Sequence, residues 1–342
     1  MSARPAALGP PRILHAPADV GGHAYCLSRA ERELGLRSDV AVLDAGQFGY
    51  GADIGVDLRG AGRWRQLRAR GGLLVRALRG YDVIHFNFGQ SLVPLHVFGH
   101  VSNELPLLKR AGKTIIVTFQ GCDVRPQSAC HCTQEHCRRE TRFRLPNAAR
   151  FLRYADRSFH LNPDLAQWLP GSRFLAYASV DPRQLRPEGE PPDHDEMLVV
   201  HAPSNREVKG TRHLLAAVER LRDHGFPIRL DLVEGVPREE VLRRLRAADV
   251  VVDQLQIGWY GGFAVEAMAL AKPVLCHIGE QNPFDTELPI VRSDPATLAA
   301  RLRELIDDRE RRRRIGAASR LFVERHHDPR AIAREVLAGV TW

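Results

Sequence analysis

Two adjacent glycines stand directly before a short helix-like stretch in the last third of the chain. The segment reads Gly258-Trp-Tyr-Gly-Gly-Phe-Ala-Val-Glu266, and a buried strand from Pro273 to Ile278 is expected after it. Glycines at a helix start let backbone N–H groups approach a ligand closely, and the positive end of the helix dipole faces that ligand. The Glu266 carboxylate lies about one turn inside the helix and can accept hydrogen bonds from hydroxyl groups. This combination suits a phosphorylated sugar.

A second loop places two cations after a strand expected at Met197–His201. It reads His201-Ala-Pro-Ser-Asn-Arg-Glu-Val-Lys-Gly210 and opens an expected helix. Arg206 offers a planar fork of donors and Lys209 a mobile point charge, so the loop is suited to bind a diphosphate. A solvated loop with two exposed cations is the alternative. Because the chain has only four lysines, the presence of Lys209 here favours the binding interpretation.

The loop Pro17-Ala-Asp-Val-Gly-Gly22 occupies the matching position in the first half of the chain. It follows a short strand expected at Arg12–Ala16 and precedes a helix expected at His23–Leu34. Its paired glycines would open a helix start to an anion. An ordinary tight turn explains the two glycines equally well.

Four cysteines gather in one short stretch of the first half. They are spaced C-x7-C-x-C-x4-C, with two histidines between them: Cys122, Cys130, Cys132 and Cys137, with His131 and His136. Thiolates and imidazoles this close can supply the four ligands of a structural zinc. Because the usual C-x-x-C pair is missing, a structural zinc and reduced cysteines without metal are equally supported. Any such zinc is assigned no catalytic role.

Size and composition are those of an ordinary globular protein that is long enough for two domains. The chain has 342 residues, 44% hydrophobic and 26% charged. No apolar run nears the roughly 20 residues of a membrane span, and no signal-peptide core opens the chain, so a cytoplasmic location is expected. Residues 1–180 hold 24 Lys+Arg against 14 Asp+Glu, which gives +10, and residues 181–342 hold 25 against 27, which gives −2. The basic first half predicts an anionic or polar partner.

Strand-like and helix-like segments alternate in two series, 1–180 and 196–342, separated by a stretch at 181–195 that is rich in Pro and charge and reads as a linker. Such alternation predicts an α/β fold of parallel sheets covered by helices on both faces. Two series predict two Rossmann-like domains facing each other across a cleft. Ligands are then expected at the carboxyl ends of the strands.

Several motifs, in the same order along most of the chain, resemble the GT-B glycosyltransferases, in particular the large retaining family 4. They are the Gly21-Gly22 loop, Tyr81-Asp-Val-Ile-His85, Thr118-Phe-Gln-Gly-Cys-Asp123, Ala178-Ser-Val-Asp181, Val208-Lys-Gly210, and Phe263-Ala-Val-Glu-Ala-Met-Ala269 with Lys272-Pro-Val274. The last block is the most specific. The resemblance implies that residues 1–180, which include the cysteine-rich loop 120–140, bind an acceptor. It implies that residues 196–342 bind a nucleotide-sugar donor, and that the sugar is transferred with retention and without a required cofactor.

The resemblance also implies roles for individual residues. Arg206 and Lys209 would hold the donor diphosphate, Glu266 would bind the nucleotide ribose, and the turn Glu234-Gly-Val236 would lie against the base. Backbone amides around residues 262–264 would meet the sugar hydroxyls. The predicted donor-binding residues are Gly21, Gly22, Ser204, Arg206, Lys209, Glu234, Val236, Tyr260, Gly261, Gly262, Phe263, Ala264 and Glu266. The predicted catalytic residues, which would face the reacting centre from the first domain, are Asp19, Gln120 and Asp123.

Three positions depart from the family pattern. Family 4 has a second glutamate eight positions before Glu266, where this chain has Gly258, so a sugar contact is expected either to be missing or to be replaced by Trp259 or Tyr260. The family's His-Gly after the fourth strand is Gln120-Gly121 here, and its arginine lies further upstream of the lysine. These departures keep two alternatives open. One is a related transferase that uses a cyclitol or a sugar phosphate, and the other is a non-catalytic binding protein.

Other partners and chemistries find less support. No Gly-x-Gly-x-x-Gly follows the first strand, and the chain has no P-loop, His-Glu-x-x-His or Gly-x-Ser-x-Gly motif. Nucleic acid is disfavoured because aromatic residues make up only 7% of the chain. The basic stretch 62–79 resembles helices with which family members make a weak peripheral membrane contact. The favoured alternative is a surface helix, interrupted at Gly71-Gly72, whose Leu67, Leu74 and Leu78 face the sheet.

Overall fold

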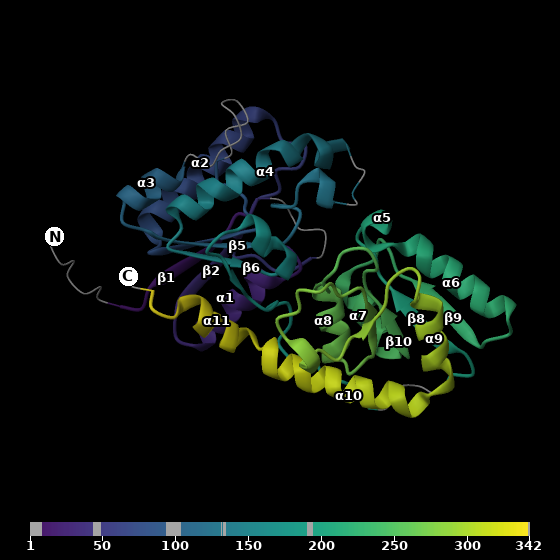
Figure 1. Cartoon of the computed structure of the whole chain (residues 1–342). Helices are drawn as coiled ribbons and strands as arrows, with labels where there is room; N and C mark the ends of the chain where they lie inside the picture. Colours follow the sequence, from purple (N-terminus) through teal and green to yellow (C-terminus); the bar gives the residue numbers. More distant parts are fainter. Residues whose placement is uncertain are drawn as a thin grey trace. The chain divides into compact units, whose positions relative to one another are not determined.

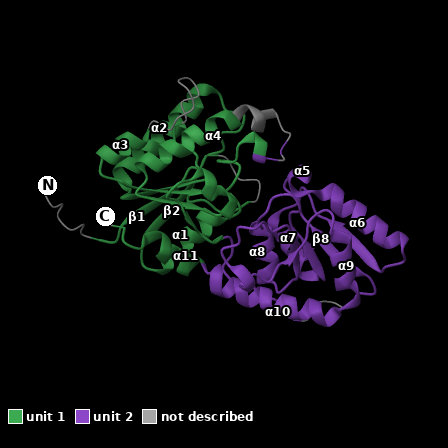
Figure 2. Cartoon of the chain, viewed as in Figure 1, with its two compact units in different colours: residues 1–128, 139–178, 329–342 green, residues 129–138, 179–328 purple. Residues whose placement is uncertain are grey.

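The protein forms two compact units, which Figure 2 shows in different colours. The computed structural model describes residues 9–43, 49–93, 104–130, 132, 135–189 and 194–340, without the side chains of residues 135–140. Unit 1 comprises residues 1–128, 139–178 and 329–342, and unit 2 comprises residues 129–138 and 179–328. The sequence division differs from this one in two places: it placed residues 329–342 with the second domain, and residues 129–138 of the cysteine-rich loop with the first.

The core of unit 1 is a seven-stranded parallel sheet in the order β3-β2-β1-β4-β5-β6-β7. Its strands are β1 Arg12–Ala16, β2 Arg37–Val42, β3 Ile54–Gly55, β4 Val83–Asn87, β5 Thr114–Phe119, β6 Arg157–His160 and β7 Arg173–Phe174. In register, Ala16 lies opposite Phe86, and Asn87 lies opposite Thr118. The carboxyl ends of β1, β4 and β5 therefore meet at one edge, which positions the loops that follow them.

Helices cover both faces of this sheet, because alternate strand residues point to opposite sides and both sides are apolar (Figure 1). Leu14 packs with α2, α3 and α4 on one face, and Ile13 packs with α1 and α11 on the other. These helices are α1 His23–Glu33, α2 Arg63–Gly80, α3 Glu104–Arg110, α4 Glu135–Tyr154 and α11 Pro329–Leu337. Short 3-10 helices lie at Gln127–Ala129 and Pro163–Trp168. Ile332 and Val336 of α11 join this core, which explains why the C-terminal segment belongs to unit 1.

Unit 2 is built on a five-stranded parallel sheet in the order β12-β11-β10-β8-β9. Its strands are β8 Met197–His201, β9 Ile228–Leu232, β10 Val250–Val252, β11 Val274–Cys276 and β12 Val291–Arg292. Its helices are α5 Arg206–Lys209, α6 Thr211–Asp223, α7 Arg238–Ala247, α8 Gly262–Ala269, α9 Leu298–Asp307 and α10 Arg309–His326, with a 3-10 turn at Asp285–Glu287. The apolar stripe of α6, namely Leu214, Ala217, Val218 and Leu221, is buried against the sheet together with α9.

Helix α2 differs from its expected form. It runs without a break through Gly71 and Gly72, so the predicted interruption is wrong. Leu74 and Leu78 pack against the core of unit 1, as expected, but the Leu67 side chain is 52% exposed and that of Trp64 is 80% exposed. No helix among the described residues is long and apolar enough to span a membrane.

Two helical glycines give a matched test of the packing. A Cβ atom added at Gly316 in α10 would lie 2.1 Å from the carbonyl oxygen of Ala271, whereas one added at Gly72 in α2 would meet nothing within 4 Å. Gly316→Ala should therefore lower the free energy of unfolding by about 1–3 kcal/mol through overpacking. Gly72→Ala should raise it by up to about 1 kcal/mol, since alanine is the better helix former.

Urea denaturation of both variants checks this pair. A Gly316→Ala protein as stable as the Gly72→Ala protein would contradict the close contact of α10 with the backbone after α8.

Candidate functional site

The predicted donor residues of unit 2 lie on loops after three neighbouring strands. Residues 202–210 follow β8, residues 233–237 follow β9, and residues 253–261 follow β10. Because β10, β8 and β9 are adjacent and parallel, these loops meet at the carboxyl edge of the sheet, where α/β proteins bind ligands. Helix α8 begins at the same edge with Gly262.

At the centre of this edge a lysine is held by a buried carboxylate. Lys209 Nζ lies 2.5 Å from Asp253 Oδ1, and Asp253 Oδ2 accepts a hydrogen bond from the Gly261 backbone N–H at 2.7 Å. The Asp253 side chain is 1% exposed and that of Lys209 is 13% exposed. Asp253 thus fixes the ammonium group beside the first residues of α8. Asp253 is not among the residues predicted from the sequence.

Arg206 and Glu234 bridge the loops after β8 and β9. Arg206 Nε donates to Glu234 Oε1 at 2.8 Å, and a second guanidinium nitrogen contacts Glu234 Oε2. This hydrogen bond holds the pKa of the Glu234 carboxyl below its usual range. The Arg206 side chain is 57% exposed, so it remains accessible to a ligand. Ser204 is exposed, and the Asn205 side chain accepts from the Val208 N–H at 3.0 Å and caps the turn.

Glu266 is paired with an arginine that the sequence analysis did not single out. Arg238 Nε, at the start of α7, donates to Glu266 Oε1 at 2.7 Å. The Glu266 side chain is 7% exposed, and that of Arg238 is 32% exposed. A buried carboxylate is stable when it is paired and hydrogen-bonded, so this contact fixes the predicted ribose ligand.

The structure explains Gly258. A Cβ atom added at Gly258 would lie 3.2 Å from both the Cα and the N of Gly279, and the Gly279 N–H donates to the Gly258 carbonyl at 2.9 Å. A glutamate at this position would therefore push two backbone segments apart. Neither Trp259 nor Tyr260 presents its ring as a replacement, because both are fully buried and the Tyr260 hydroxyl lies 3.1 Å from His327 Nε2.

In unit 1 the carboxylate of Asp19 lies at the helix start that follows the glycine loop after β1. Asp19 Oδ1 accepts from the Ala24 N–H of α1 at 3.0 Å. Burial raises the pKa of Asp19 to about 6. Gly21 and Gly22 adopt φ values of 64° and 74°, and a Cβ atom at Gly22 would collide with the Tyr50 ring. The glycines are therefore explained by the turn and by this packing.

The turn after β5 is organised in the same way. Asp123 Oδ1 accepts from the Gly121 N–H at 2.7 Å, and both Asp123 oxygens lie 3.1 Å from the Gln120 N. The Asn162 amide donates to the Gln120 carbonyl at 2.5 Å. Asp123 thus fixes the turn, and burial raises its pKa to about 6.

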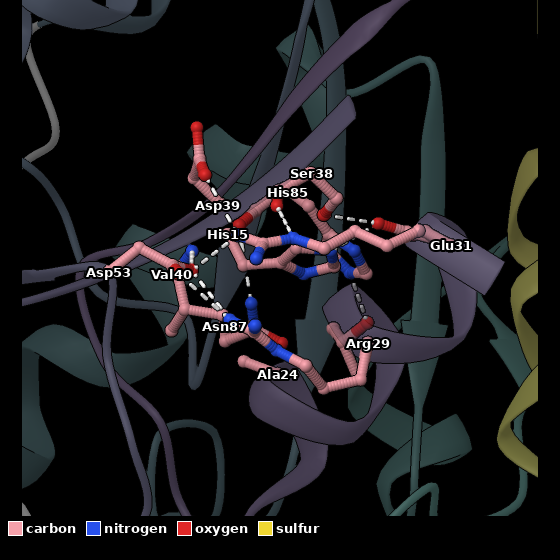
Figure 3. A network of polar contacts seen from close by, with 12 residues as sticks. His15, Ala24, Arg29, Glu31, Ser38, Asp39, Val40, Asp53, His85 and Asn87 are labelled. Carbon is pink, nitrogen blue, oxygen red and sulfur yellow. Dashed lines mark hydrogen bonds and ion pairs between the residues drawn. The ribbon is translucent and has the colours of Figure 1, made fainter. Parts of the chain in front are cut away.

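A buried polar network lies between α1 and the sheet of unit 1 (Figure 3). His15 Nε2 lies 2.8 Å from Glu31 Oε2, which also accepts from Ser38 Oγ at 2.6 Å. The rings of His15 and His85 lie 4.8 Å apart, on paired positions of β1 and β4. Burial, followed by the neighbouring His15, holds the pKa of His85 well below its usual range. This network ties α1 to three strands and so supports the loop that bears Asp19.

The cysteine cluster is described only in part. Cys122 lies in the turn after β5, and Cys130 and Cys132 lie between β5 and α4, with Cys132 buried. His131 and the side chain of Cys137 fall outside the described residues. Among the side chains that are described, no three His, Cys, Asp or Glu are grouped so as to hold a metal ion. The structural zinc therefore stays a prediction.

Comparisons with known proteins were made at the level of sequence and of structure. No family model matches the chain, and no curated protein matches it. Solved structures match over nearly the whole chain. A sucrose-phosphate synthase from Thermosynechococcus elongatus superposes with a TM-score of 0.67 at 18% identity, covering 95% of this chain and 97% of that chain. An alpha-glucosyltransferase in complex with UDP and a 13-mer DNA gives 0.62 at 12%, covering 94% and 97%.

The N-terminal domain of the trehalose-6-phosphate phosphatase from Candida albicans gives a TM-score of 0.66 at 12% identity, covering 99% of both chains. Identities this low show the fold alone. The predicted fold class is confirmed: the chain has the α/β fold with two parallel sheets that GT-B glycosyltransferases share. Because one fold hosts different chemistries, function is argued from the site.

The raised pKa of Asp123 predicts a pH-dependent effect on stability. Its folded pKa of about 6 lies above its usual value of 3.8, so between these pH values the folded protein binds more protons than the unfolded chain. Stability is then lost as the pH rises. Asp123→Asn removes this loss, so from pH 4 to pH 7 the variant should gain about 2 kcal/mol relative to the wild type.

Urea denaturation of both proteins at each pH measures this difference, and a difference independent of pH would contradict the buried carboxyl. Asp57→Asn is the control. The pKa of Asp57 is lowered to about 2, first by its hydrogen bond with Arg59. Its folded and unfolded pKa values both lie below 4, so its substitution should produce little change over this range.

Metal content decides between the two interpretations of the cysteine-rich stretch, a structural zinc or reduced cysteines without metal. The zinc interpretation predicts that protein washed with a weak chelator and analysed by mass spectrometry of metals contains about one zinc per chain. A content below roughly 0.2 zinc per chain would rule out the structural zinc.

Proposed function

We propose that the protein is a glycosyltransferase that moves a sugar from a nucleoside-diphosphate sugar, with retention, to an acceptor bound by unit 1. The observation that supports this most is the Lys209–Asp253–Gly261 arrangement at the carboxyl edge of unit 2. It holds a cation and the start of α8 side by side, and both attract a diphosphate. The solved alpha-glucosyltransferase of similar fold, in complex with UDP, agrees with a nucleotide at such a site.

In the proposed reaction the chain supplies mainly electrostatic stabilisation. Lys209, Arg206 and the N–H groups at the start of α8 stabilise the negative charge that develops on the departing diphosphate. Glu266 binds the ribose, and the turn after β9 lies against the base. Because Lys209 is fixed by Asp253 before the donor arrives, little reorganisation is needed as the charge develops.

Asp19, Gln120 and Asp123 are the proposed acceptor-side residues of unit 1. The start of α1 and the turn after β5 already donate their N–H groups to Asp19 and Asp123. An acceptor would therefore meet side-chain groups at this edge, with Gln120 the neutral one among them. The alternative function is a transferase that uses a cyclitol or a sugar phosphate. It would need the diphosphate site around Lys209 only if its donor were a nucleotide.

The exposed positions of α2 are the surface proposed for a peripheral membrane contact. Trp64 and Leu67 stand among arginines on this helix, a pattern suited to anionic lipid. Flotation with anionic vesicles at low salt tests the contact, and a protein that stays with the soluble fraction would exclude it.

A nucleotide panel tests the proposed function. Thermal unfolding of the wild type with UDP, GDP, ADP and their sugars should show a clear stabilisation by at least one of them, because a ligand that binds only the folded state raises its stability. Absence of a response to every nucleotide would favour the non-catalytic binding protein.

The role of Lys209 gives a sharper test. Lys209→Ala should lower the affinity for the responding nucleotide about tenfold and the rate of sugar transfer about a hundredfold. Lys109→Ala is the matched control, since Lys109 also pairs with an aspartate, Asp156, at 2.7 Å but on the surface of unit 1. Calorimetry and a transfer assay measure the two effects, and unchanged turnover in Lys209→Ala would refute the assignment.

A further inference from the structure

The ion pair between Arg238 and Glu266 is unlike the other pairs on α7. The other arginines of α7 that form ion pairs bind carboxylates that are 26–69% exposed, namely Glu240, Asp231 and Glu188. Arg238 instead reaches from the first residue of α7 to a carboxylate on α8, and that carboxylate is 93% buried because its side-chain exposure is 7%. The pair therefore joins two helices at the edge where the nucleotide is proposed to bind.

Burial gives this contact a physical consequence. A carboxylate taken out of water is stable as the charged form only when a cation or several donors compensate it. The guanidinium of Arg238 compensates Glu266 and, because its fork is planar and rigid, also limits how the carboxylate can rotate. An ionised carboxylate is purely an acceptor with about four lone-pair positions, so one bound to Arg238 can still accept from hydroxyl groups.

We propose that Arg238 is a positioning residue that fixes Glu266 for the 2′-hydroxyl of the nucleotide ribose. The site then prefers ribonucleotides over 2′-deoxyribonucleotides, and the preference depends on Arg238 as well as on Glu266. This inference rests on the proposed function, since it assumes that Glu266 meets the ribose. It gives a role to Arg238, for which the sequence motifs imply none.

The test compares a ribonucleotide with its deoxy analogue. The probe is the nucleoside diphosphate that stabilises the wild type in the thermal panel, together with its 2′-deoxy form, both measured by isothermal titration calorimetry. The wild type should bind the ribonucleotide at least about tenfold more tightly, because a hydrogen bond to a charged group is lost in the analogue. In Arg238→Ala this preference should disappear, while the affinity for the deoxy form should change less than about twofold.

Four further variants make the result specific. Glu266→Gln should also lose the preference, and Arg238→Ala combined with Glu266→Gln should lose no more than either alone, as expected for two residues that act through one contact. Arg238→Lys keeps the charge without the fork and should recover part of the preference. Arg243→Ala is the matched control on the same helix and should leave both affinities unchanged.

Two outcomes would overturn the inference. An equal loss of affinity for both nucleotides in folded Arg238→Ala would make Arg238 a phosphate contact, and an intact ribose preference would make the pair purely structural. Where Arg238→Ala fails to fold, the ratio of the ribonucleotide affinity to the deoxyribonucleotide affinity is measured in Arg238→Lys and decides in the same way. Failure of the proposed function looks different, because the wild type would then bind neither nucleotide.

Discussion

The site in unit 2 depends on one buried charge pair, Lys209 with Asp253. The pair lies where β10 ends, and the second oxygen of Asp253 holds the Gly261 N–H. One carboxylate therefore sets the position of a cation and of the start of α8 at the same time. A buried pair of this kind adds little net stability because both groups lose their hydration. Its effect is to fix geometry, which is the property that stabilising a developing charge requires.

Carboxylates that bind a cation or a backbone N–H group recur at the carboxyl edges of both sheets. In unit 2 each of three cations is paired with a carboxylate on a different loop or helix: Lys209–Asp253, Arg206–Glu234 and Arg238–Glu266. In unit 1 the two backbone anion sites are filled by Asp19 and Asp123. The turns that bear Asp19 and Asp123 are thus held by the chain's own carboxylates, whereas the loops of unit 2 retain cations that a diphosphate can reach.

Much of the fold could be predicted from the sequence, because strand and helix periodicity is a local property. β1 and β8 have the predicted bounds. The site was less predictable, since its residues are chosen by partners distant in sequence. Asp253 looked like the continuation of an apolar strand, but the strand ends at Val252 because Asp253 turns to Lys209 and Gly261. Arg238 was not among the predicted residues, because nothing in the local sequence reveals its contact with Glu266.

Trp259 and Tyr260 show the opposite error, in which a residue looks available but is buried: Trp259 stacks on Phe284, and the Tyr260 hydroxyl contacts His327, the residue after α10. The central claim is that the edge around Lys209 binds a nucleoside diphosphate. A crystal structure of the protein soaked with UDP, GDP or ADP tests it most directly. The account predicts the diphosphate between Lys209 and the N–H groups at the start of α8, with the ribose on Glu266. A nucleotide bound elsewhere, with the Lys209–Asp253 edge unchanged and filled by water, would contradict it.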